Sequence, residues 1–200
     1  MAKIKLTKNE LKKQKDSLKM YRRYLPTLML KKQQLQGEIR QTDLRLKELH
    51  TAKENLDDGF KPWISVFGET GFFTKDIIKI TSLRTSLGNV AGVSIPIFEG
   101  ANFDVSKYDL MKTPAWLDMA VEAMQQALLL DLEAQIVEEQ RRRLDKELRT
   151  TTQRVNLFEK VKIPEARNNI KKIQVYLGDQ QTASVVRGKI AKSGTEKAAK

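Results

Sequence analysis

Cysteine and histidine, the residues most often used for nucleophilic attack, proton relay and zinc binding, are nearly missing from this sequence. It contains no cysteine and one histidine, His50, so a thiolate nucleophile, a multi-histidine metal site and a histidine-based relay lack their residues. We interpret His50 as a residue on an exposed helix face. Glu138 and Glu139 precede Arg141–Arg143 at helical spacing, which predicts surface ion pairs rather than a carboxylate active site. We therefore expect no catalytic residue, no cofactor and no bound metal.

One glycine-containing run, Gly88-Asn89-Val90-Ala91-Gly92, invites comparison with a phosphate-binding loop. Such a loop continues with Gly-Lys and then Ser or Thr, and this run does not. A turn beside a strand is the better interpretation. We expect no direct nucleotide binding.

The composition favours long helices over a thick globular core. Charged residues make up 31% of the chain and aromatic residues only 6%, a mixture typical of long helices and coiled coils. No apolar run approaches the roughly 18 residues that cross a bilayer, and the first residues lack the apolar core of a signal peptide. We expect a soluble, cytoplasmic protein.

The first predicted element is a long helix from about Asn9 to Leu56, within a segment of residues 1–56. Its apolar positions follow a heptad repeat, which is typical of a coiled-coil seam. The two series of seam positions are Leu11, Leu18, Leu25, Lys32, Ile39, Leu46 and Lys53, and Gln14, Tyr21, Leu28, Leu35, Thr42, Leu49 and Leu56. Asn9 is the predicted N-cap. Pro26 is expected to kink the helix, because its ring removes a donor and clashes with the preceding turn.

The second predicted arm occupies residues 113–200 and starts with Thr113 as N-cap and Pro114 at the first helical position. Its apolar stripe keeps a four-three spacing and then resumes one residue out of phase after Pro164. The members of the stripe are Leu144, Leu148, Thr151, Val155 and Phe158, followed by Ala166, Ile170, Ile173 and Leu177. The shift predicts a bend or a local change of supercoil at the proline.

The two arms are expected to pair antiparallel, with the second arm running past the first. If they turn where the first helix ends, Leu11 falls opposite about Val161. Gly178 disfavours helix beyond Leu177, and about Ile190 is the furthest predicted helical residue.

The middle segment, residues 57–112, contains turn residues and β-prone runs. One run is 63–67, and two further strand candidates are Asp76 to Arg84 and Val90 to Phe98. The residues 86–89 are the predicted connection of a β-hairpin. We expect this hairpin to form a small head at the tip where the arms turn.

The formal net charge of +12 is concentrated at the two ends of the chain. Residues 1–32 hold eleven basic and two acidic side chains, and residues 185–200 hold five and one. In an antiparallel hairpin these ends would form one basic tip, suited to nucleic acid, an anionic membrane surface or an acidic protein cavity. The N-terminal lysines have few interleaved aromatic residues and no recognised nucleic-acid fold, so nucleic acid is the weakest of these candidates.

Three stretches, in order over nearly the whole chain, resemble the D subunit of the V-type and A-type rotary ATPases. They are Leu6–Leu11, Gly88–Pro96, and Arg154-Val155-Asn156 followed by Ile163-Pro164. The last is the most specific. The chain departs from the family pattern at Leu6, where proline is usual, and in the glycine-containing stretch from Gly178 to Lys192.

The resemblance implies a mainly α fold: a long antiparallel two-helix coiled coil with a small β-hairpin-containing middle segment. It implies a central rotor axle that transmits torque between the ATP-hydrolysing or ATP-synthesising A/B head and the membrane ion-translocating ring. The implied partners are the catalytic A and B subunits, the F subunit and the adaptor of the membrane ring, with the chain peripheral to the membrane through the complex. Catalysis would belong to the A/B ring.

The residues that carry the resemblance are the candidates for protein interaction. They are Arg154, Asn156, Ile163 and Pro164 in the second arm, Asn89, Gly92 and Pro96 in the middle segment, and Lys8 and Lys12 at the basic start. We expect no nucleic-acid partner. The first alternative function is a coiled-coil scaffold or tethering protein with a basic tip, and the second, weaker one is a protein whose basic arm binds nucleic acid. The first alternative explains the arms and leaves the three ordered motifs unexplained.

Overall fold

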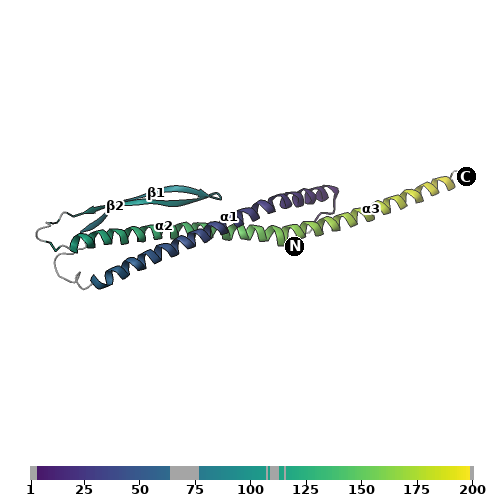
Figure 1. Cartoon of the computed structure of the whole chain (residues 1–200). Helices are drawn as coiled ribbons and strands as arrows, with labels where there is room; N and C mark the ends of the chain where they lie inside the picture. The colour runs from purple at the N-terminus through teal and green to yellow at the C-terminus, as the bar shows by residue number, and fades with distance from the viewer. Residues whose placement is uncertain (1–3, 64–76, 107, 109–112, 115, 199–200) are drawn as a thin grey trace. The chain divides into compact units, whose positions relative to one another are not determined.

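The computed structural model of the chain describes residues 4–63, 77–106, 108, 113, 114 and 116–198. The elements, in chain order, are helix α1 (Lys8–Phe60), the 3-10 helix η1 (Lys61–Trp63), strands β1 (Ile78–Val90) and β2 (Val93–Val105), helix α2 (Trp116–Asn156), the π-helix η3 (Leu157–Lys162) and helix α3 (Ile163–Ala198) (Figure 1). The predicted fold class, long antiparallel helices with a small β-hairpin between them in sequence, is confirmed.

The chain packs as two units, each containing part of α1 and an antiparallel stretch of the second arm. Unit 1 comprises Met1–Lys32 and Thr150–Lys200, and unit 2 comprises Gln33–Arg149.

Helix α1 is capped by Thr7, so the prediction of Asn9 as N-cap was wrong. The Thr7 hydroxyl oxygen accepts a hydrogen bond from the Glu10 backbone N–H at 3.3 Å, and the Thr7 carbonyl accepts one from the Leu11 N–H. Thr-x-x-Glu is the sequence pattern of a capping box. Asn9 lies inside the first turn of the helix.

The heptad assigned to α1 matches the burial along the whole helix. All fourteen predicted seam positions are buried or half-buried, with Leu35 at 0% exposed and Leu49 at 3%. Off the seam, Leu30 and Leu44 are each 60% exposed. The helix continues on both sides of Pro26. The heptad spacing therefore predicted the buried face of this helix correctly.

In unit 1 the two arms pair further along the chain than expected. The Asn169 side-chain amide donates to the Gln14 amide oxygen at 3.5 Å, and the rings of Tyr21 and Phe158 lie with centroids 5.2 Å apart. The prediction that Leu11 lies opposite about Val161 was therefore wrong. The heptad spacing shows which face of each arm is buried. It does not show how far one arm is shifted along the other, so this pairing could not be predicted.

Helix α3 runs on to Ala198, well beyond the predicted end near Ile190. Every described side chain from Gly178 to Gly194 is exposed, so the helix overshoots the paired region as expected. Because Gln14 already lies opposite Asn169, residues 185–198 continue past the start of α1, and the two helix ends lie apart (Figure 1). The prediction of one combined basic tip was wrong; the chain has two separate basic regions.

In unit 2 the arms are joined by ion pairs flanking the seam. Arg45 binds Glu133 at 2.6 Å, Lys53 binds Asp131 at 2.6 Å, and Arg141 binds Asp43 at 2.6 Å. Helix α2 begins at Trp116, two residues later than predicted, and the Leu117 N–H donates to the Pro114 carbonyl just before it. Thr113 and Pro114 thus precede the helix.

Strands β1 and β2 form a two-stranded antiparallel hairpin whose connection is shorter than predicted. Val90 pairs with Val93, so the turn is Ala91-Gly92 and residues 86–89 belong to β1. Both turn residues have positive φ, 50° at Ala91 and 81° at Gly92, as in a type I′ turn. Asn89 stabilises the turn by accepting the Gly92 N–H at 2.9 Å.

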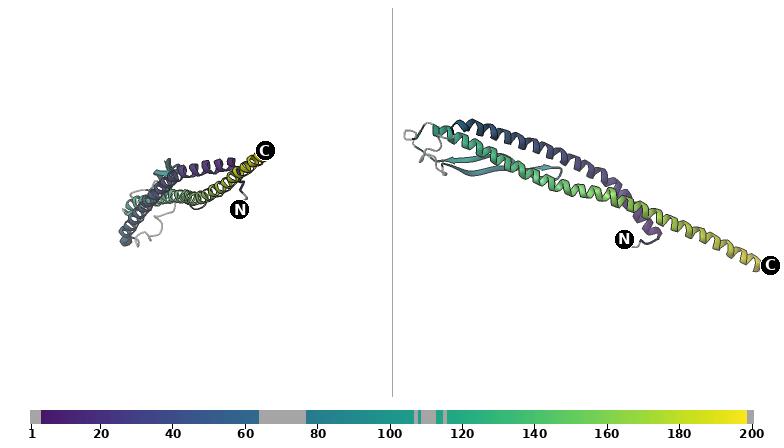
Figure 2. Two further views of the ribbon diagram at one scale, coloured as in Figure 1. Left: turned by 90° about the vertical axis from the view of Figure 1, so that its right-hand side faces the viewer. Right: turned by 90° about the horizontal axis from the view of Figure 1, so that it is seen from below.

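The hairpin lies alongside α2, and Figure 2 shows the same arrangement from below. Near the turn, Ile95 packs with Leu35 and Leu144 in one buried cluster. At the open end, Ile77 packs with Leu117 and Val121 in another. The hairpin therefore starts at the end where the arms turn, as predicted, and extends from there along α2. Of the β-prone run 63–67, Trp63 lies in η1 and the rest lies outside the described residues.

Candidate functional site

The candidate residues lie on several surfaces of the described part of the chain. His50 is exposed on α1, as predicted. Among the described residues, no group of three or more His, Cys, Asp or Glu could hold a metal ion, and no helix is long and apolar enough to cross a membrane. The predicted interaction residues lie on surfaces of both units, and these surfaces are the candidate site.

The first surface contains the second-arm motif and surrounds η3 in unit 1. Arg154 and Asn156 are exposed in the last turn of α2, and Pro164 is exposed in the first turn of α3. Ile163 is only 7% exposed, so its side chain belongs to the core of the unit. Of the four predicted residues, three are accessible to a partner.

The helix between these residues is wider than an α-helix. The Ile163 N–H donates to the carbonyl of Phe158, five residues earlier, which is the hydrogen bond of a π-turn. None of the residues of η3 is buried, and Leu157 and Val161 are 43% and 48% exposed. Two apolar side chains thus stand at the surface beside the motif.

The basic N-terminal surface is also in unit 1, on the first turns of α1. Lys8 and Lys12 are both exposed. A shallow groove beside them is lined by Asn9, Lys12, Lys13, Asp16, Ser17 and Met20. This surface can make screened electrostatic contacts with an acidic partner.

The third surface is the turn end of the hairpin in unit 2. Asn89 and Gly92 are exposed and define the turn. Pro96 is half-buried, and its carbonyl accepts a hydrogen bond from the Gln140 side chain at 2.5 Å. Asn89, Gly92 and Pro96 thus lie together, as their spacing in one hairpin requires.

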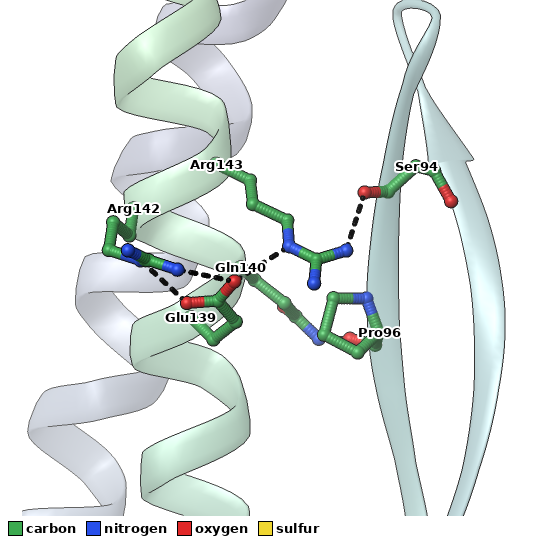
Figure 3. Close-up of polar contacts among 6 residues, drawn as sticks. All are labelled: Ser94, Pro96, Glu139, Gln140, Arg142 and Arg143. Atoms are coloured by element: carbon green, nitrogen blue, oxygen red, sulfur yellow. Dashed lines mark hydrogen bonds and ion pairs between the residues drawn. The ribbon is translucent and has the colours of Figure 1, made fainter.

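A polar latch, which we define as Glu139, Gln140, Arg142 and Arg143 of α2, holds β2 against the helix (Figure 3). Arg143 donates to the Ser94 carbonyl at 3.2 Å and to Glu139 at 2.8 Å. Glu139 also accepts hydrogen bonds from Arg142 at 2.6 and 3.0 Å. These two arginines lower the pKa of the Glu139 carboxyl to about 2, chiefly through the hydrogen bonds to Arg142 and Arg143.

The latch was not predicted from the sequence. Its charged residues were interpreted as ion pairs on a solvated helix face, and Glu139 does pair with arginines one turn away. The sequence did not indicate that Arg143 and Gln140 also donate hydrogen bonds to carbonyls of β2, more than forty positions earlier in the chain. No local pattern encodes contacts over that separation.

The fold and these surfaces define an antiparallel coiled-coil protein with a side-docked β-hairpin. The family model described as the D subunit of ATP synthase matches residues 10–193. The chain is 52% identical over 193 residues to the V-type ATP synthase D subunit of Borreliella burgdorferi, covering 96% of this chain and 95% of that protein. It is 33% identical over 191 residues to the protein of that name in Chlamydia muridarum, with 94% of each chain covered. This chain belongs to the family of ATP synthase D subunits.

Proposed function

We propose that this chain is the central rotor axle of a V/A-type rotary ATPase. In this role it is a non-catalytic component that transmits torque between the A/B head and the membrane ion-translocating ring. The observation that carries the proposal is family membership over residues 10–193 in a chain built mainly of two long arms that each bury an apolar stripe. Two supercoiled helices resist bending and twisting better than one, which is what a shaft requires.

We assign different partners to the basic ends of the arms and to the hairpin. The basic N-terminal lysines and the far end of α3 would lie within the ring of A and B subunits. The hairpin would lie nearer the F subunit and the adaptor of the membrane ring. The chain would then be cytoplasmic and peripheral to the membrane through the complex, with ATP bound only by the A/B head.

An off-axis shaft provides a physical route for coupling. If it touches three catalytic sites unequally, its angle biases their conformations in turn, and nucleotide affinity is linked to shaft angle. Arg154, Asn156 and Pro164 are exposed and available for such contacts, as are Asn89 and Gly92 of the hairpin. Ile163 and Pro96 would act by holding these surfaces in place.

The test is reconstitution of the A/B head with and without this chain. We expect one copy of the chain per A/B hexamer, measured by native mass spectrometry, and a changed ATPase turnover. Failure to associate at low ionic strength would reject the axle role and leave a coiled-coil scaffold as the better account.

Charge reversal tests the basic surface within the same assay. The double variant Lys8→Glu, Lys12→Glu should reduce assembly at low salt, with a smaller difference at high salt because exposed charges are screened. The double variant Arg40→Glu, Lys47→Glu is the matched control, because it makes the same four-unit change of charge at exposed positions of the same helix outside the basic surface. Equal assembly of the double variant and the control would show that Lys8 and Lys12 make no contact with the head.

A further inference from the structure

The buried stripe of the second arm changes phase by one residue within η3. Thr151 and Val155 are 1% and 4% exposed before it, and Ala166 and Ile173 are 3% and 0% exposed after it. A regular helix that kept the four-three spacing from Val155 would bring positions 162 and 165 to the seam. The seam instead holds Ile163 and Ala166, one position later.

The π-helix supplies the extra residue. A π-turn closes a hydrogen bond over five residues where an α-turn closes it over four, and the Ile163 N–H bonds the Phe158 carbonyl in this way. The seam is also weakest here, because no residue of η3 is buried. Phe158, half-buried against Tyr21, is the contact that bridges this turn to α1.

Pro164 accounts for the position of the wide turn. Proline has no N–H, and in a regular helix its ring clashes with the carbonyl four residues earlier, here that of Lys160. A wider turn in front of the proline removes this conflict. The structure therefore combines, within eight residues, a phase shift, a π-turn and a proline that opposes its closure.

We propose that η3 is a register joint, held open by Pro164, that takes up one residue of phase between the two seams of the C-terminal arm. The wide turn accommodates this extra residue, and the apolar stripes before and after it can therefore both face α1 in unit 1. Within the paired part of the arm, between Thr151 and Ile173, the joint is also the point that opens with the least loss of packing, since it contributes no buried side chain.

The proposal makes an unusual prediction for a one-residue deletion. Removing Lys160, an exposed residue of η3, together with Pro164→Ala should close the turn to a regular α-helix and keep both seams in phase. In the full chain, the melting temperature followed by circular dichroism at 222 nm should stay within about 4 °C of the parent. Pro164→Ala alone keeps the extra residue and isolates the effect of the proline.

Two controls change the length of the arm without that compensation. One alanine inserted after Lys160 makes the phase shift two residues, and deleting exposed Arg149 puts Thr151 and Val155 out of phase. Both should lower the melting temperature by at least about 10 °C, because buried seam residues rotate away from α1. If the closed variant melts as low as these controls, η3 is not a register joint.

Hydrogen exchange tests the local opening separately. In the parent, amides of η3 should exchange at least about tenfold faster than those at Thr151–Val155 and at Asn169–Ile173. In the closed variant this difference should disappear. Equal protection across all three stretches of the parent would overturn the claim that the arm opens at η3, whatever the melting temperatures show.

Discussion

At the residue scale, the packing of unit 2 depends on a few fully buried side chains. Leu35 is 0% exposed and lies in one cluster with Ile95 and Leu144. This cluster joins α1, β2 and α2, so one leucine contributes to both the pairing of the arms and the docking of the hairpin. A thin coiled coil has no second layer of side chains to refill a cavity.

We therefore expect Leu35→Ala to lower the free energy of unfolding by about 2–5 kcal/mol. Leu44→Ala removes the same atoms from the same helix at a position that is 60% exposed, and should change stability by less than about 0.5 kcal/mol. Urea unfolding followed by circular dichroism measures both. Similar losses for the two variants would show that the seam assignment is wrong.

Glu139 makes the docking of the hairpin depend on pH. The folded-state pKa of its carboxyl is lowered from 4.5 to about 2, so its contribution to stability is present above pH 4.5 and is lost as the pH falls toward 2. Over this range the parent should lose more stability than Glu139→Gln, which cannot titrate at this position. Parallel urea titrations at pH 5, 4 and 3 should show curves for the two proteins that converge as the pH falls.

At the element scale, replacing glycine with alanine should have opposite effects on stability at two positions, Gly92 and Gly178, that both have open space around them. A Cβ added at Gly92 or at Gly178 meets no atom within 4 Å. Gly92 has φ +81° in the hairpin turn, a conformation that costs an alanine roughly 1–2 kcal/mol. Gly178 lies inside α3, where alanine is favoured by roughly 0.5–1 kcal/mol.

Gly92→Ala should therefore destabilise the chain and Gly178→Ala should stabilise it, each by about 1 kcal/mol. Thermal melts of the two variants beside the parent provide the measurement. Destabilisation by Gly178→Ala would mean that α3 is not helical at this point in solution.

The elements were predictable where a period or a local capping pattern decides them. The heptad located the buried face of α1 over its whole length. The one-residue phase shift predicted a bend or a change of supercoil at Pro164, and the structure has a π-helix just before it. The cap at Thr7 was equally readable, since Thr7 and Glu10 have capping-box spacing. It was missed because Asn9 is the stronger single-residue N-cap.

The remaining features depend on contacts between distant parts of the chain. The pairing of Gln14 with Asn169 fixes how far one arm is displaced along the other, and a heptad is unchanged when the partner moves by whole repeats. The hairpin starts at the turn end of the arms as predicted, but its docking along α2 through Ile95 and the latch could not be predicted from the sequences of its two strands. The interaction residues were chosen by resemblance, and burial separated Ile163 from its exposed neighbours.

At the scale of the whole molecule, the chain divides its charge between two regions that lie apart. The lysines around Lys8 and Lys12 belong to the paired part of unit 1, whereas Arg187, Lys189 and Lys192 stand on the unpaired end of α3. A partner could therefore engage one region without the other. Variants that neutralise one basic region at a time would distinguish the roles of the two regions. A single combined tip would not allow this separation.

Among the described parts of the chain, the unpaired end of α3 should be the first that a protease removes. Trypsin should cut after Arg187 and Lys189 at least about tenfold faster than after Arg167, which is exposed but lies between buried Ala166 and Asn169. Mass spectrometry of timed digests measures the order of cutting. Equal rates would show that the end of α3 is protected in the free chain.

The exposed end of α3 also bears on how a cell would match the amount of this chain to its partners. A helix without a packed neighbour is only marginally stable in water, so in a copy that has found no partner this end should unfold more often than the paired part of the arm and be open to proteases. A partner that enclosed this end would remove this exposure at the moment of assembly. Surplus copies would then be cleared without any dedicated recognition sequence, and the amount of this chain would follow the amount of whatever receives it.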